Sequence, residues 1–176
     1  WIVFGRMIDK NMDLWIMKSD GTNEKQLTFT EDDQEGAPYF LPDSETIIFR
    51  AWKASEYDQK PTPMTIYTMK RDGSGRKAVT YTHDMNWAPY PAPDGRHFVF
   101  VRAETQRNWE VYLGDLQSKE IKRITFDEGF DGFPSISPDG RKMVWTTPRS
   151  AGPKAGFMQG LKLHVMDITS LGLGPK

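Results

Sequence analysis

Three polar side chains recur at one position of this sequence, each of them three residues before a proline. They are Glu35, Asn86 and Asp131. Carboxylate and amide oxygens are the ligands that calcium prefers in proteins, and carboxylates also attract a basic peptide terminus. We predict that the three residues form part of a polar ring at the mouth of a channel. Three interpretations stay open: the ring holds a hard cation such as calcium, it holds a basic peptide terminus, or it only solvates the channel and caps strand ends.

A second group of residues has the chemistry of a partner-binding surface. Aromatic side chains in exposed loops often anchor a protein partner. Three of these aromatics lie in long insertions between strands, where folding back over the strands explains them equally well. The candidates are Trp52, Tyr57, His83, Asp84, Trp87, Phe130 and Phe157.

Motifs of enzymes and of cofactor binding are missing from the sequence. It contains no Gly-x-Ser-x-Gly, no Walker motif, no HExxH and no dinucleotide fingerprint. Cysteine is absent, which removes disulfides, thiolate metal ligands and cysteine nucleophiles from this segment. We therefore predict no catalytic residue and no cofactor other than the calcium considered above.

The elements that must position these residues are written in a repeat. A turn of the Pro-Asp-Gly type occurs three times, with Ser44 in place of the glycine once, and a short apolar strand follows each copy. The turns are 42–44, 93–95 and 138–140, and the strands are 47–49, 98–100 and 143–145. Residues 2–4 look like a fourth copy of the strand. A strand-rich repeat of about 45–52 residues is typical of a β-propeller or a related array.

Four kinds of strand fit the repeat. The innermost strands, 35–40, 86–91 and 131–136, each contain a proline, which belongs on an edge strand because it cannot donate to a ladder. The third strands are 14–17, 66–69, 111–114 and 163–166, and the fourth strands are 26–29, 78–81 and 123–126. The sequence therefore predicts an all-β propeller of four-stranded antiparallel blades, with about three and a half blades present.

We treat residues 1–176 as one partial propeller domain. Its predicted parts are an incomplete blade 1–29, blades 30–81 and 82–126, an incomplete blade 127–170 and a tail 171–176. An open arc leaves apolar faces bare at both ends. If each face exposes on the order of 500 Å², the loss is roughly 12 kcal/mol per face. We expect the remainder of the same parent chain, or a second copy, to complete a six-bladed ring.

Composition excludes some partners. Formal net charge is -1, and no block of like charge occurs, so we expect no binding to nucleic acid. No apolar run approaches about 18 residues, so we expect no membrane span.

Several strings of the sequence resemble the TolB-like Pro-Asp-Gly propeller repeat. They are Ser-Pro-Asp-Gly-Arg-Lys at 137–142, Phe-Asp-Gly-Phe-Pro at 130–134, Asn-Trp-Ala-Pro-Tyr at 86–90 and Ile-Met-Lys-Ser-Asp-Gly at 16–21. The resemblance covers nearly the whole chain. It implies a bacterial, exported, protein-binding scaffold, in the periplasm or outside the cell. Similar repeats occur in propellers attached to peptidases and in some polysaccharide lyases.

In an up-and-down blade the loops alternate between two faces. Loops that join one blade to the next share a face with loops between second and third strands, whereas the other face carries only tight turns. The long-loop face would contain 30–34, 82–85 and 127–130 and the two insertions 52–63 and 148–160. We predict a non-enzymatic interaction module that binds a protein or peptide there. The alternatives are the accessory propeller of an exported hydrolase (a peptidase) or redox complex, and, ranked last, a sugar lyase.

Overall fold

The computed structural model describes residues 1–150 and 157–175, which form four antiparallel sheets. The first sheet has β1 (Ile2–Ile8), β2 (Asn11–Met17) and β3 (Lys25–Gln26). The second has β4 (Asp33–Phe40), β5 (Thr46–Lys53), β6 (Thr65–Lys70) and β7 (Lys77–Ala78). The third has β8 (Asn86–Pro91), β9 (His97–Thr105), β10 (Asn108–Asp115) and β11 (Ile121–Arg123). The fourth has β12 (Gly132–Ile136), β13 (Lys142–Thr147) and β14 (Lys162–Asp167).

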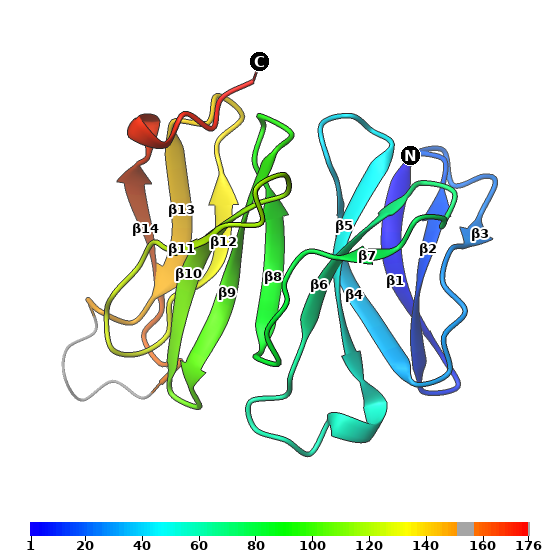
Figure 1. The fold of residues 1–176 in the computed structure, drawn as a ribbon, viewed down its shortest axis with the longest axis horizontal. Helices are drawn as coiled ribbons and strands as arrows, with labels where there is room; N and C mark the ends of the chain where they lie inside the picture. Colours follow the sequence, from blue (N-terminus) through cyan, green and yellow to red (C-terminus); the bar gives the residue numbers. More distant parts are fainter. Residues whose placement is uncertain (151–156, 176) are drawn as a thin grey trace.

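The sheets follow one another in an arc, with the first and the fourth at its two ends (Figure 1). Each is a meander in which consecutive strands pair, and each packs against the sheets beside it. This is the arrangement of propeller blades, so the predicted fold class is confirmed. Two short 3₁₀ turns, Ala54–Glu56 and Thr169–Leu171, are the helical segments among the described residues, and neither is long enough to cross a membrane.

The core lies between neighbouring sheets rather than inside any one of them. Between the first and second sheets Leu14 and Phe49 are fully buried in one apolar cluster. Between the second and third, Ile66 packs with Phe100. Between the third and fourth, the core includes Trp145. β5 and β9, in the two middle sheets, bury consecutive side chains and therefore both of their faces, so these strands read as apolar runs rather than as strict alternation.

A bulge interrupts each innermost strand just before its proline. The register shifts between Gly36 and Tyr39, and equivalent shifts occur in β8 and β12. The residue before the proline has a positive φ each time: 50° at Ala37, 50° at Ala88 and 53° at Phe133. An extra residue in one strand bends that strand and aims its side chain away from the ladder.

Aspartate shapes the tight turns. In the first, the Asp43 carboxylate accepts hydrogen bonds from the backbone N–H of Glu45 at 2.9 Å and of Thr46 at 2.8 Å. Asp94 and Asp139 accept equivalent bonds. Ser44 takes the left-handed conformation expected for the glycine it replaces, with φ of 57°. These turns lie on one face of the arc, and the longer loops lie on the opposite face (Figure 1).

The fourth strands are shorter than the sequence predicts. β3 ends at Gln26 rather than at Phe29. The hydroxyl of Thr28 accepts a hydrogen bond from the backbone N–H of Leu14 at 2.9 Å, and Thr80 and Thr125 do the same for the strands beside them. The threonine side chain thus accepts the hydrogen bond from the neighbouring strand at this position, so the backbone of the fourth strand can leave the ladder.

Candidate functional site

The predicted polar ring is present as three equivalent positions, but all three side chains are buried. Relative exposure is 0% for Glu35, 0% for Asn86 and 1% for Asp131. Each has an arginine partner: Arg76 for Glu35, Arg102 for Asn86 and Arg149 for Asp131. The prediction that they open onto a channel mouth is therefore corrected, because internal hydrogen bonds and ion pairs already engage them.

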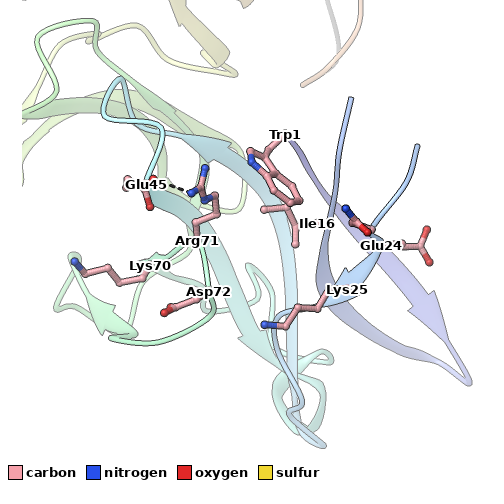
Figure 2. A pocket seen from close by; sticks show the side chains of 9 residues that line it. Trp1, Ile16, Glu24, Lys25, Glu45, Lys70, Arg71 and Asp72 are labelled. Atoms are coloured by element: carbon pink, nitrogen blue, oxygen red, sulfur yellow. Dashed lines mark ion pairs between the residues drawn. The ribbon is translucent and has the colours of Figure 1, made fainter. Parts of the chain in front are cut away.

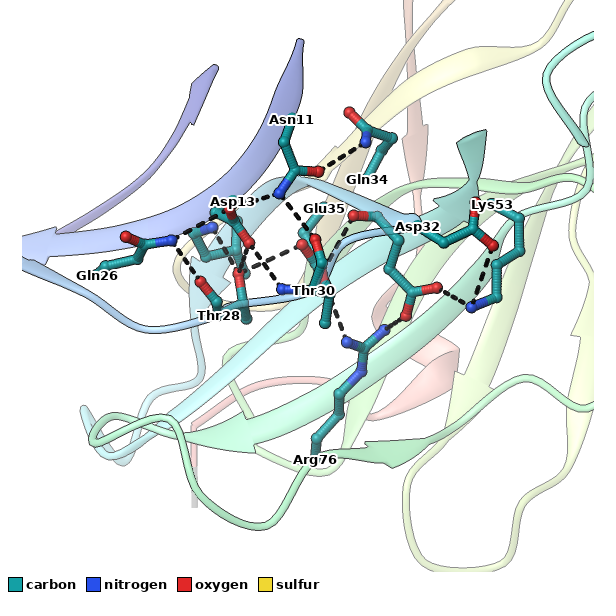
Figure 3. Close-up of polar contacts among 12 residues, drawn as sticks. Asn11, Asp13, Gln26, Thr28, Thr30, Asp32, Gln34, Glu35, Lys53 and Arg76 are labelled. Atoms are coloured by element: carbon teal, nitrogen blue, oxygen red, sulfur yellow. Dashed lines mark hydrogen bonds and ion pairs between the residues drawn. The ribbon is translucent and has the colours of Figure 1, made fainter. Parts of the chain in front are cut away.

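Glu35 is the centre of a polar network between the first and second sheets (Figure 3). Its carboxylate accepts hydrogen bonds from the hydroxyl of Thr30 at 2.9 Å and from Arg76 at 2.9 Å. The hydroxyl oxygen of Thr28 lies 3.3 Å from a carboxylate oxygen of Glu35 and 3.1 Å from one of Asp13. The single hydroxyl proton can therefore be donated to either carboxylate. Burial raises the pKa of Glu35 to about 6, although Thr30 and Arg76 oppose the rise.

Calcium binding by these three residues stays a prediction. Within residues 1–150 and 157–175, no group of three His, Asp, Glu or Cys side chains is placed to hold a metal ion. A calcium titration followed by melting temperature tests the prediction. An unchanged melting temperature at millimolar calcium, the range of weak extracellular sites, would contradict it.

A recess on the long-loop face contains two of the predicted binding residues. It has a volume of about 240 Å³ and lies beside Trp52, Lys53 and His83. The His83 ring, in a side chain that is 70% exposed, lies 3.4 Å from the carboxylate of Glu56. Trp52 was expected in the insertion, but the structure places it in β5, because the strand continues to Lys53 before the chain turns.

The insertion between β5 and β6 carries Tyr57, which is 60% exposed. The ammonium of Lys60 lies 4.4 Å from the centre of its ring. On the neighbouring loop the carboxylate of Asp84 lies 3.8 Å from Arg102. Both candidates therefore lie on the surface. The second predicted insertion, 148–160, falls partly outside the described residues.

Five aromatic rings meet at the long-loop end of the third and fourth sheets. They are Trp87, Trp109, Phe130, Phe133 and Phe157. Trp87 packs edge-on against Phe133, with ring centres 4.7 Å apart. Phe133 is 49% exposed, whereas Phe130 is 1% exposed. Phe130 was predicted to contact a partner; instead, its ring fills the space that a side chain at Gly132 would occupy.

Three residues of this region escaped the sequence analysis. They are Arg50, Trp109 and Phe133. Arg50 stands where the other repeats have the uncharged Val101 and Thr146, and Phe133 stands where they have Ala37 and Ala88. These two departures from the repeat were the signal available in the sequence.

A second depression lies on the tight-turn face, between the first and second sheets (Figure 2). It has a volume of about 670 Å³. Acidic and basic side chains line it in equal number: Glu24, Glu45, Asp72, Lys25, Lys70 and Arg71. Arg71 is already paired with Glu45 at 2.8 Å and lies over the ring of Trp1. Its balanced and partly paired charges offer no preference for a charged ligand.

Fold and repeat together define a β-propeller segment with long loops on one face. The profile of the TolB beta propeller domain family matches residues 9–169. The chain belongs to this family. Its predicted resemblance to TolB-like propellers is thereby confirmed.

Individual relatives agree with this assignment. An uncharacterized protein of Agrobacterium fabrum is 26% identical over 148 residues, which cover 78% of this chain and 47% of that protein. The Tol-Pal system protein TolB of Alcanivorax borkumensis is 28% identical over 87 residues, covering 49% of this chain and 20% of that protein. The chain thus spans about half or less of the relatives it matches.

Solved structures show the same fold. TolB from Acinetobacter baumannii superposes with a TM-score of 0.76 at 22% identity, covering 94% of this chain and 38% of that one. A putative TolB from Agrobacterium tumefaciens gives 0.75 at 18% identity, covering 94% and 57%. At these identities the likeness concerns the fold alone.

Proposed function

We propose that this chain is part of a non-enzymatic, exported protein-interaction propeller, located in the periplasm or outside the cell. It binds a protein or a peptide on its long-loop face. The observation that carries the proposal is the partly exposed aromatic surface around Trp87 and Phe133, together with the exposed Tyr57 on the insertion between β5 and β6. Exposed aromatic rings next to adaptable loops are the common anchors of protein interfaces.

Family membership supports the same proposal. One relative is named as a Tol-Pal system protein, which fits a role in an exported assembly. Fractionation of the source cells tests the location: recovery in the cytoplasm alone would contradict it. The sequence that flanks this chain in its gene separates the proposal from the alternative, an accessory propeller of a hydrolase or redox complex.

We also propose that further sequence of the parent chain, or a second copy, completes the ring. The two end sheets expose apolar side chains. Met7 on β1 is 61% exposed, and Leu163 and Val165 on β14 are 72% and 63% exposed. Covering such faces removes apolar surface from water. Native mass spectrometry tests this: a monomer of 20.2 kDa that stays soluble and folded would contradict it.

Site-specific photo-crosslinking tests the binding face. A photoreactive amino acid replaces Tyr57 on the long-loop face, and in a control it replaces Arg141 on the tight-turn face; both residues are exposed. The expected result in intact cells is a discrete cross-linked product from position 57 and none from position 141. Products from position 141 alone would place the partner on the other face and refute the assignment.

A further inference from the structure

Arg50 is the one partly buried arginine without a hydrogen bond or an ion pair among the residues that the structure describes. Its Nε is buried and has no acceptor. Other arginines, such as Arg76, Arg123 and Arg149, each pair with a carboxylate. Burial alone lowers the pKa of Arg50 to about 10, so the group is still charged at neutral pH. An uncompensated charge that is partly removed from water is costly.

The surroundings of Arg50 hold the guanidinium in place without neutralising it. Its carbon lies 5.3 Å from the ring centre of Trp52 and 5.8 Å from that of Trp87. On the innermost strand it faces Gly36, where an added Cβ would lie 3.7 Å from the guanidinium. The rings of Trp52 and Trp87 and the glycine at 36 thus leave space for the guanidinium, and none of these three residues carries a negative charge.

Apolar surface begins directly beside this charge. The ring of Trp87 has its centre 5.8 Å from the guanidinium carbon of Arg50 and 4.7 Å from the ring centre of Phe133, which is exposed. Phe133 has a positive φ of 53°, a strained conformation for a bulky residue, whereas Ala37 and Ala88 occupy the same place in the other repeats. Strain of this kind is often retained where the side chain has a function.

We propose that Arg50 binds the carboxylate of a peptide C-terminus whose last side chain is apolar and lies on Trp87 and Phe133. A single cation matches one negative charge rather than an acidic stretch. In a terminal residue the carboxylate and the side chain leave the same Cα, which suits a cation and an apolar surface that share the ring of Trp87. This inference rests on the proposed function, because it names the chemistry of the partner.

The test uses the protein with whatever sequence flanks this chain in its gene. The probe is acetyl-Gly-Gly-Phe with a free carboxylate, and its comparison is the same peptide as a C-terminal amide. Binding is followed by NMR at the Arg50 Nε–H signal and the tryptophan indole signals. The free acid should bind about tenfold or more tightly than the amide, as expected for loss of one charge-assisted hydrogen bond.

Variants locate the effect. Arg50→Met should remove the preference for the acid, while Arg141→Met, at an exposed arginine of the tight-turn face, should keep it. Phe133→Ala should weaken both peptides and keep their ratio. Melting curves confirm that each variant is folded.

Three results would overturn the inference: no saturation by the acid up to about 10 mM, which is weaker than any useful affinity; equal binding of acid and amide; or a preference that survives Arg50→Met. Equal binding of acetyl-Gly-Asp-Phe-amide would reassign the site to acidic side chains and refute the terminal carboxylate. Photo-crosslinking at position 57 distinguishes the proposed binding face from the proposed role of Arg50. Cross-links that persist in the Arg50→Met variant would support the binding face and contradict carboxylate binding by Arg50.

Discussion

Replacing Glu35 by glutamine should change how stability depends on pH. The carboxyl is fully buried, and its pKa rises from 4.5 to about 6 in the folded chain. A raised folded pKa favours the protonated form. The stability that the folded chain gains by binding a proton at Glu35 is therefore complete below about pH 4.5, and it is lost as the pH rises through about 6. At about 1.4 kcal/mol for each tenfold change in proton affinity, the loss is roughly 2 kcal/mol.

Glutamine resembles the protonated carboxyl. Its carbonyl oxygen can accept from Thr30, and Arg76 keeps its ion pair with Asp33 at 2.6 Å. Glu35→Gln and the unsubstituted protein should therefore be about equally stable near pH 4.5. At pH 7.5 the variant should be more stable by about 2 kcal/mol.

The assay is urea unfolding of both proteins at several pH values, with the difference in free energy of unfolding plotted against pH. Every other titrating group is present in both proteins and cancels to first order. A difference that does not change with pH would refute the reasoning. A difference that favours the unsubstituted protein as pH rises would show that the ion pair with Arg76, rather than burial, dominates.

Three further substitutions have defined expectations. Gly114→Ala would place a Cβ 2.4 Å from the ring of Phe98, so thermal melts should show a loss of about 1–3 kcal/mol, and an unchanged melting temperature would contradict the packing. Thr80→Val leaves the buried N–H of Ile66 without the hydroxyl at 2.9 Å, and urea unfolding should show a loss of about 1–3 kcal/mol. Arg50→Met should instead stabilise the free protein by about 1–3 kcal/mol, because it removes an unpaired charge; a loss would mean that the contacts with Trp52 and Trp87 outweigh the cost of that charge.

The turns of this fold could be predicted from the sequence because their causes are local. An aspartate two residues before a backbone N–H, as in Asp43 and Glu45, closes a turn without help from the rest of the chain. The apolar runs that follow the turns predict the strands in the same way. The fourth strands were predicted too long, because Thr28 and its equivalents end the ladder through a contact with another strand.

The sites depend on contacts across sheets. The sequence alone determined the repeat, the blade type, the family resemblance and which end of each blade carries the long loops, since these follow from neighbours in the chain. Only the tertiary structure buried Glu35 beneath Arg76 and brought Arg50, Trp87 and Phe133 together from three different sheets. Burial and pairing are set by packing between blades, and no local pattern in the sequence encodes which side chains will meet there.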